Sequence, residues 1–144
     1  QGTGNVACGF LKGYGIKEGA VALSVAHDSH NIIVVGVNDE EMEFAVNSLI
    51  AQEGGIVLVK EGKVIEQMPM PIAGLMSDQS GEWVDEKLTS IHEKAYTELG
   101  ICGDVEPVMT LCFMSLAVIP EIKLTDMGLF DVTTFSFIPV EISR

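Results

Sequence analysis

The 144 residues of this chain are enough for one domain with a substantial hydrophobic core. Apolar residues make up 47% of the sequence, yet no run approaches the roughly 18 consecutive apolar residues that a membrane-spanning helix needs. Acidic residues outnumber basic residues by 21 to 8, and the net charge of −13 disfavours binding to nucleic acid and to anionic membrane surfaces.

Residues 1–19 form a glycine-rich leading segment in which only residues 6–12 suggest a short regular element. Residues 20–27 are apolar on both sides, which predicts a strand covered on both faces of a sheet. A second β-branched run follows at residues 31–37, and the short connection through Asp28 and Ser29 predicts a tight antiparallel hairpin. Because the sequence starts within glycine-rich loop sequence, we expect the chain to be a fragment of a longer polypeptide.

A helix is predicted to begin at residues 38–41, where Asn38 can cap free amide groups and Glu41 stands three residues later. Apolar residues then recur at helical spacing up to Ile50, and Gly54 gives a C-terminal stop. The runs 56–60 and 63–68 predict a second hairpin that turns at Gly62. After an irregular stretch rich in proline and methionine, helical spacing of apolar residues predicts an amphipathic helix from about residue 82 to 99.

The last third of the chain begins with an apolar run, residues 107–119, bracketed by Pro107 and Pro120. This run is ambiguous between a buried helix and a strand, and Pro107 at its start favours a helix. Residues 131–142 predict a final strand, with Pro139 at an edge or a bulge. Together the elements predict a single α/β domain of α+β type, with a mixed, largely antiparallel sheet and flanking helices.

Two of the three histidines, His27 and His30, stand three residues apart in the sequence AHDSHN. If Asp28 and Ser29 form a two-residue loop, the histidines face each other with Cβ atoms about 4.5–5.5 Å apart, close enough to share a metal ion. Asp28 could then be a third ligand or could orient one ring. The alternative is that Asp28, Ser29 and Asn31 only satisfy the backbone of a turn.

Other chemistries lack their sequence motifs. The chain has no zinc-deaminase signature of His-x-Glu with Pro-Cys-x-x-Cys, no Gly-x-Ser-x-Gly and no P-loop. Cys8, Cys102 and Cys112 are an odd number without a Cys-x-x-Cys pair, so we expect reduced, buried thiols and a cytoplasmic protein. His92 stands within the second predicted helix beside its apolar stripe and is expected to be a boundary residue rather than a ligand.

Three blocks of sequence carry a resemblance to a known family. They are residues 13–42 (GYGIKEGAVALSVAHDSHNIIVVGVNDEEM), residues 68–78 (MPMPIAGLMSD) and residues 107–132 (PVMTLCFMSLAVIPEIKLTDMGLFDV). Through these blocks, essentially the entire chain resembles the C-terminal domain of bacterial and archaeal adenine deaminases of the amidohydrolase superfamily. The departures are modest: GVNDEEM stands where GTNDEDM is usual in that family.

The resemblance implies that residues 1–144 are the C-terminal accessory domain of an enzyme that hydrolyses adenine to hypoxanthine and ammonia in purine salvage. It implies as partner an N-terminal catalytic (β/α) barrel of the same polypeptide, in which a divalent metal (manganese, iron or zinc) activates water. Three histidines in the chain are too few for a binuclear amidohydrolase centre, so we expect no catalytic residue here. The candidate loop that would face the active site consists of His27, Asp28, Ser29, His30 and Asn31.

Two alternatives remain open from the sequence. The chain could be a stand-alone regulatory module that binds a metal or a small ligand through His27, His30 and Asp28. It could also be a structural oligomerisation domain. The high apolar content leads us to expect a homo-oligomer, or a face that the missing barrel covers in the intact enzyme.

Overall fold

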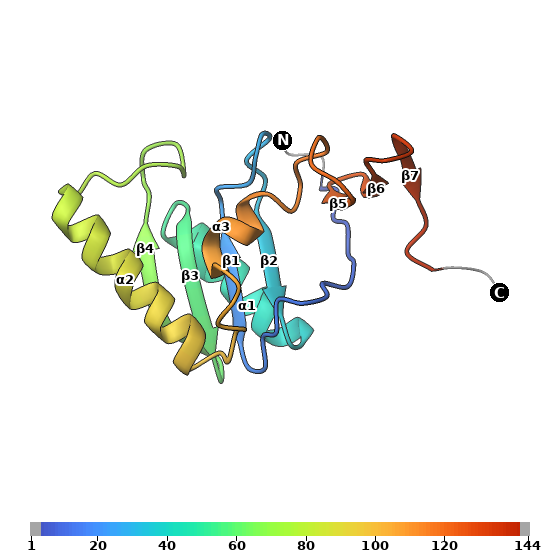
Figure 1. Ribbon diagram of the computed structural model, residues 1–144. Coiled ribbons are helices and arrows are strands. Elements are labelled where there is room, and N and C mark those ends of the chain that lie inside the picture. The colour runs from blue at the N-terminus through green and yellow to red at the C-terminus, as the bar shows by residue number, and fades with distance from the viewer. Residues whose placement is uncertain (1–3, 142–144) are drawn as a thin grey trace.

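A four-stranded sheet forms the centre of the fold in the computed structural model, which describes residues 4–141 (Figure 1). Its strands lie in the order β2 (Ile33–Gly36), β1 (Ala20–Leu23), β3 (Gly55–Lys60) and β4 (Lys63–Pro69). Leu23 lies opposite Ile33 on one side and opposite Ile56 on the other. Every strand pairing among the described residues is antiparallel, which confirms the predicted largely antiparallel sheet with flanking helices.

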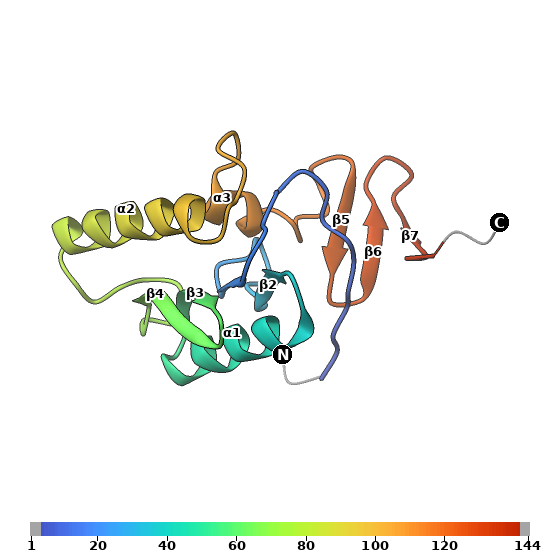
Figure 2. The same ribbon diagram turned by 90° about the horizontal axis from the view of Figure 1, so that it is seen from below.

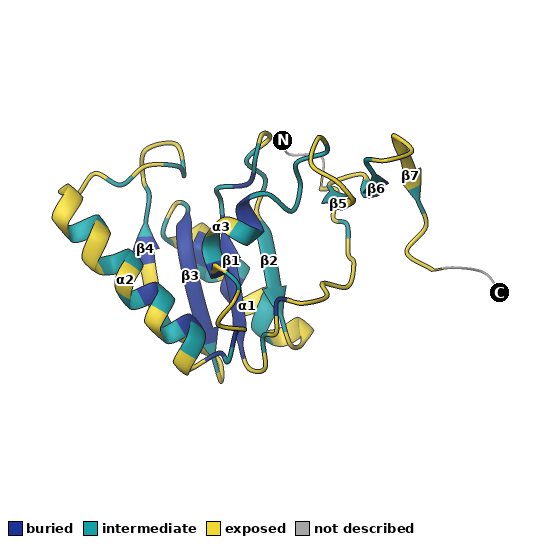
Figure 3. Ribbon diagram, in the orientation of Figure 1, coloured by how far each residue is buried: buried dark blue, intermediate teal, exposed yellow. Residues whose placement is uncertain are grey.

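Strand β1 is buried on both faces because its alternate side chains enter two different cores. Ala20 and Ala22 pack with Ala45 and Leu49 of α1 (Asp39–Ala51). Val21 and Leu23 belong to the larger core on the opposite face, which α2 (Gly81–Thr97) and α3 (Pro107–Cys112) cover. The result is three layers, with α1 below the sheet and α2 and α3 above it in Figure 2, and with the most deeply buried strands at the centre in Figure 3.

The helix starts follow the capping signals of the sequence. The Asn38 side chain accepts a hydrogen bond from the Glu41 N–H at 2.8 Å, and the Ser80 hydroxyl accepts one from the Trp83 N–H at 3.3 Å. The α1 and α2 predictions are therefore confirmed, and so is the β3–β4 hairpin. No helix formed by residues 4–141 combines the length and the apolar character needed to cross a bilayer.

The first hairpin has a longer loop than predicted. Strand β1 ends at Leu23 and β2 begins at Ile33, so residues 24–32 connect them and the two-residue turn at Asp28 and Ser29 is wrong. Ser24 explains the early end of β1, because its hydroxyl donates to the Gly74 carbonyl at 2.5 Å and accepts from the Gly55 N–H at 2.7 Å. These two bonds tie Ser24 to the loop at Gly74 and to the first residue of β3, so the strand pairing with β2 stops there.

The C-terminal region differs most from the prediction. Helix α3 ends at Cys112, well before residue 119, and a three-stranded sheet of β5 (Ile122–Thr125), β6 (Gly128–Asp131) and β7 (Ser136–Ile138) follows. The prediction of a single strand over residues 131–142 is wrong. The Asp131 carboxylate accepts hydrogen bonds from the Thr133 and Thr134 N–H groups, and these bonds stabilise a turn between β6 and β7. Residue 142 lies outside the described residues. We call residues 122–140 the arm, which projects to one side in Figures 1 and 2. The short element predicted at 6–12 is neither helix nor strand.

Candidate functional site

The loop at residues 24–32 is fixed against the end of α3 by backbone hydrogen bonds. The His27 N–H donates to the Cys112 carbonyl at 2.8 Å, and the Ser115 hydroxyl donates to the His27 carbonyl at 2.9 Å. Within the loop, the His30 N–H donates to the Ala26 carbonyl at 2.6 Å. The backbone that carries the candidate side chains is therefore held in one place by a neighbouring element.

The structure brings the two predicted histidines together, although not on opposed strands. The ring centroids of His27 and His30 are 5.3 Å apart, and the rings meet edge to face at 65°. His27 also stacks on Phe113, with centroids 4.9 Å apart and an angle of 21° between the rings. This contact could not be predicted from the sequence, because Phe113 lies inside an apolar run that indicates only a buried segment.

The environment of the histidine pair leaves one polar atom without a partner. His30 Nδ1 is shielded from solvent and has no hydrogen-bond partner among the described residues. His27 Nδ1 lies 3.9 Å from Asp28 Oδ1, on a side chain that is 87% exposed. Within residues 4–141, no group of three or more His, Cys, Asp or Glu side chains is placed to hold a metal ion. A metal at this pair would take its remaining ligands from water or from another part of the polypeptide.

The other three candidate residues, Asp28, Ser29 and Asn31, line a groove of about 700 Å³. One wall of this groove is apolar and consists of Ile32, Ile33 and Val34 at the edge of the main sheet, with Val46 of α1. The opposite wall is built from residues 4–7, 115–118 and 124–126. This wall could not be predicted from the sequence, because it joins segments more than a hundred residues apart. The groove thus has polar groups at one end and apolar side chains along its length, as binding sites for small molecules or peptide segments do.

The remaining histidine and the cysteines lie in structural surroundings. His92 Nε2 is 2.5 Å from Glu106 Oε1, and the Glu106 carboxylate also caps α3 by accepting the Met109 N–H. Cys112 is buried beside the loop, where burial and then the negative charge of Glu106 raise the pKa of its thiol. Cys8 and Cys102 are exposed, so the expectation of buried thiols is wrong for these two residues.

Comparison with known proteins gives a consistent result over the whole chain. Residues 1–136 match the model of the adenine deaminase C-terminal domain family. The chain is 75% identical over 141 residues to adenine deaminase 2 of Desulfotalea psychrophila and 52% identical over 139 residues to adenine deaminase of Halalkalibacterium halodurans. These alignments cover 98% and 96% of this chain but only 24% of each relative, so the chain spans about a quarter of the length of the curated relatives it matches.

A third relative, adenine deaminase 2 of Carboxydothermus hydrogenoformans, is 49% identical over 140 residues, again 97% of this chain and 24% of the relative. The match to the family model covers nearly the whole sequence, including the loop at residues 24–32 and both walls of the groove. The chain belongs to the adenine deaminase C-terminal domain family.

Proposed function

We propose that this chain works as the C-terminal accessory domain of a cytoplasmic adenine deaminase, a polypeptide that hydrolyses adenine to hypoxanthine and ammonia in purine salvage. The observation that carries the proposal is the match of residues 1–136 to this family, together with 75% identity to a relative named adenine deaminase 2. Because the chain accounts for 24% of that relative, the remaining length is sufficient for a catalytic barrel.

We assign the metal chemistry to that barrel. Replacing the amino group of adenine by oxygen needs an activated water molecule, which a bound manganese, iron or zinc ion supplies. The side chains described here do not fit such a centre, because no three candidate ligands come together among residues 4–141 and the whole chain has three histidines. No catalytic step is therefore assigned to residues of this chain.

We assign a supporting role at the active site to the loop with His27, Asp28, Ser29, His30 and Asn31. Three observations support this role: the loop backbone is fixed to α3, Asp28 and Asn31 border a groove, and His30 Nδ1 has no partner among the described residues. Polar groups on a fixed backbone can meet a partner surface with little loss of conformational entropy. The loop would thus close one side of the barrel mouth and exclude water.

The test measures ammonia release from adenine by the full-length polypeptide and by its His27→Ala and His30→Ala variants. We expect the wild-type polypeptide to turn over adenine, and each variant to lose about tenfold in kcat, which corresponds to about 1.4 kcal/mol of activation free energy. His92→Ala is the matched control and should leave kcat unchanged. If the wild-type polypeptide does not turn over adenine, the proposed deaminase function is refuted. Unchanged kinetics with an altered oligomeric state in the loop variants would instead favour a structural oligomerisation domain.

A second candidate function is a regulatory module that binds a metal or a small ligand. The unpartnered His30 Nδ1 and the 5.3 Å separation of the two imidazole rings support it. Titration of the chain with Zn²⁺ in a calorimeter distinguishes it from the accessory role. One-to-one binding that disappears in both His27→Ala and His30→Ala would favour the module, whereas no saturable binding would exclude it.

A further inference from the structure

Exposed apolar side chains gather on one side of the molecule. More than half of the exposed large apolar residues among those described come from two segments, 6–11 and 118–140. We call the surface that they form the apolar flank; its members are Val6, Phe10, Leu11, Val118, Ile119, Ile122, Met127, Phe135, Phe137 and Val140. Single exposed apolar residues are ordinary on protein surfaces, but a gathering of this size marks an interaction site.

The arm supplies half of the ten flank residues, which lie in β5 and β7 and in the segments beside these strands. One face of the arm sheet meets the N-terminal segment, where a methyl group added at Gly9 would be 3.2 Å from the Leu129 side chain. On the opposite face, Phe135 and Phe137 meet Phe130 edge to face at 5.2 Å, so that Phe130 is only 9% exposed while the two outer rings remain 76% and 52% exposed. A three-stranded sheet with strands this short needs a cover over its apolar face to be stable.

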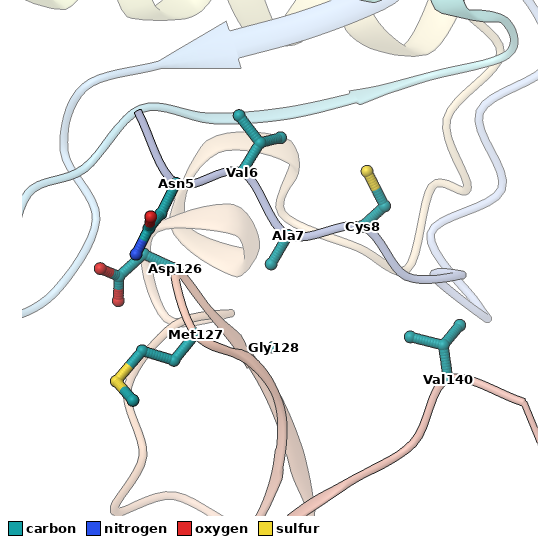
Figure 4. A pocket seen from close by; sticks show the side chains of 8 residues that line it. All are labelled: Asn5, Val6, Ala7, Cys8, Asp126, Met127, Gly128 and Val140. Atoms are coloured by element: carbon teal, nitrogen blue, oxygen red, sulfur yellow. The ribbon is translucent and has the colours of Figure 1, made fainter. Parts of the chain in front are cut away.

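The flank is continuous with the groove of the candidate loop. A hollow of about 490 Å³ lies between residues 5–8 and the β5–β6 turn at residues 126–128, with Cys8 and Val140 among the residues that line it (Figure 4). Val6, Ala7 and Asp126 line both this hollow and the groove that Asp28 and Asn31 border. A partner that covers the flank would therefore also reach the loop.

We infer that the apolar flank is the docking surface for the preceding part of the same polypeptide, an inference that rests on the proposed function. The matched relatives are about four times as long, and this family forms their C-terminal domain, so the rest of their chain comes before it. Residues 6–11 are part of the flank, so the preceding chain is tethered beside the surface at a high effective concentration.

Charge favours this occupant over a second copy of the chain. Two copies that each carry a net charge of −13 repel each other. The segments that form the flank contain only three of the 21 acidic residues, with one lysine. The ten flank side chains are themselves uncharged, so the flank is an apolar surface on a strongly acidic domain, which suits a permanent intramolecular interface more than association between acidic molecules.

The native cysteines provide the test in the full-length polypeptide. Cys8 stands between the flank residues Val6 and Phe10 and lines the hollow, Cys102 lies outside both, and both thiols are exposed in this domain. The experiment uses peptide mass spectrometry to measure the rate at which N-ethylmaleimide alkylates each thiol. Each rate in the folded protein is divided by the rate of the same thiol in the urea-unfolded protein. We expect Cys8 to react at least about tenfold more slowly than Cys102 in the full-length polypeptide, since alkylation needs access to the thiol.

Matched variants show whether the flank causes the protection. Ile122→Gln with Met127→Gln should raise the Cys8 rate toward that of Cys102, and glutamine leaves the charge around the thiol unchanged. Ile50→Gln is the control, because Ile50 is 58% exposed on α1 and Ile122 is 51% exposed in the arm. Equal rates for Cys8 and Cys102 in the wild type would overturn the inference. So would protection that is lost when an oligomer dissociates on dilution, because a second copy would then be the cover.

The outcomes also separate this inference from the proposed function. If the full-length polypeptide deaminates adenine but leaves Cys8 unprotected, the proposed function is supported and the inference of a docking surface is refuted. If Cys8 is protected in a full-length polypeptide that does not deaminate adenine, the proposed function is refuted and the inference of a docking surface is supported.

Discussion

At the residue scale, Glu66 of β4 shows how a buried charge links two layers of the fold. Its side chain is 9% exposed and accepts hydrogen bonds from Lys87 at 2.7 Å, from Ser90 at 2.5 Å and from Lys94 at 3.0 Å, all on α2. Burial by itself would raise the pKa of Glu66, but the bonds from these α2 residues outweigh it and lower the pKa to about 2. The carboxylate therefore fastens α2 to the edge of the sheet.

This lowered pKa predicts a pH-dependent contribution to stability. Because the folded pKa lies below the ordinary value of 4.5, the contribution is present above about pH 4.5 and is lost as the pH falls toward 2. Glu66→Gln should lower the free energy of unfolding by about 3 kcal/mol at pH 7 and by much less near pH 2. Urea unfolding at several pH values measures this, with exposed Glu43→Gln on α1 as control. Equal pH dependence in the two variants would contradict the assignment.

The candidate site could be predicted in part from single residues. The spacing of His27 and His30 indicated a pair, and the structure places their rings in contact. The groups that hold the pair could not be predicted, because Ser115 is 88 positions from His27 in the sequence and Phe113 lies in an apolar run. Only the packing of α3 against the loop brings them together. Local patterns in the sequence contain no information about such a contact.

At the scale of elements, the connection from α1 into β3 depends on a glycine that allows a close backbone approach. Gly55 has a φ of +115°, and a Cβ atom at this position would lie 2.0 Å from the Met68 carbonyl oxygen. This contact lets β3 begin directly beside β4 while the Gly55 N–H reaches Ser24. The start of β3 and the start of the candidate loop are therefore joined at one point.

A pair of glycine substitutions tests this connection. Gly55→Ala must move the backbone of β4, so we expect the free energy of unfolding to fall by at least about 3 kcal/mol. Gly62→Ala is the control, since Gly62 also has a positive φ, +67°, but has open space around it; here we expect about 1 kcal/mol. Chemical denaturation measures both values. An equal decrease in the free energy of unfolding for the two variants would show that the positive φ, and not the contact with Met68, causes the destabilisation.

Elements with local signals were predictable and the others were not. Helices α1 and α2 have capping residues and an apolar stripe, and the β3–β4 hairpin turns at Gly62, so local patterns sufficed for all three. The arm was missed because β5 and β6 are only four residues long, and their pattern is too short to distinguish from loop. The prediction for residues 24–32 was wrong because the Ser24 hydroxyl bonds to Gly74 and to Gly55 at the start of β3, which are 50 and 31 positions away in the sequence.

At the scale of the whole molecule, the fold divides into a well-covered body and a bare side. The body is a three-layer arrangement with two cores, one on each face of the main sheet. The arm and residues 6–11 present the apolar flank, next to the groove and the candidate loop. A domain with this organisation fits an accessory role in a larger polypeptide, because its exposed apolar surface and its polar loop lie on the same side.

The most direct measurement of the central claim is adenine deamination by this chain alone beside the full-length polypeptide, each supplied with manganese, iron or zinc. We expect turnover by the full-length polypeptide and none by the isolated chain, because no three candidate ligands come together among residues 4–141. Retained circular dichroism of the isolated chain would show that it is folded in the assay. Metal-dependent production of hypoxanthine by the isolated chain would contradict the account.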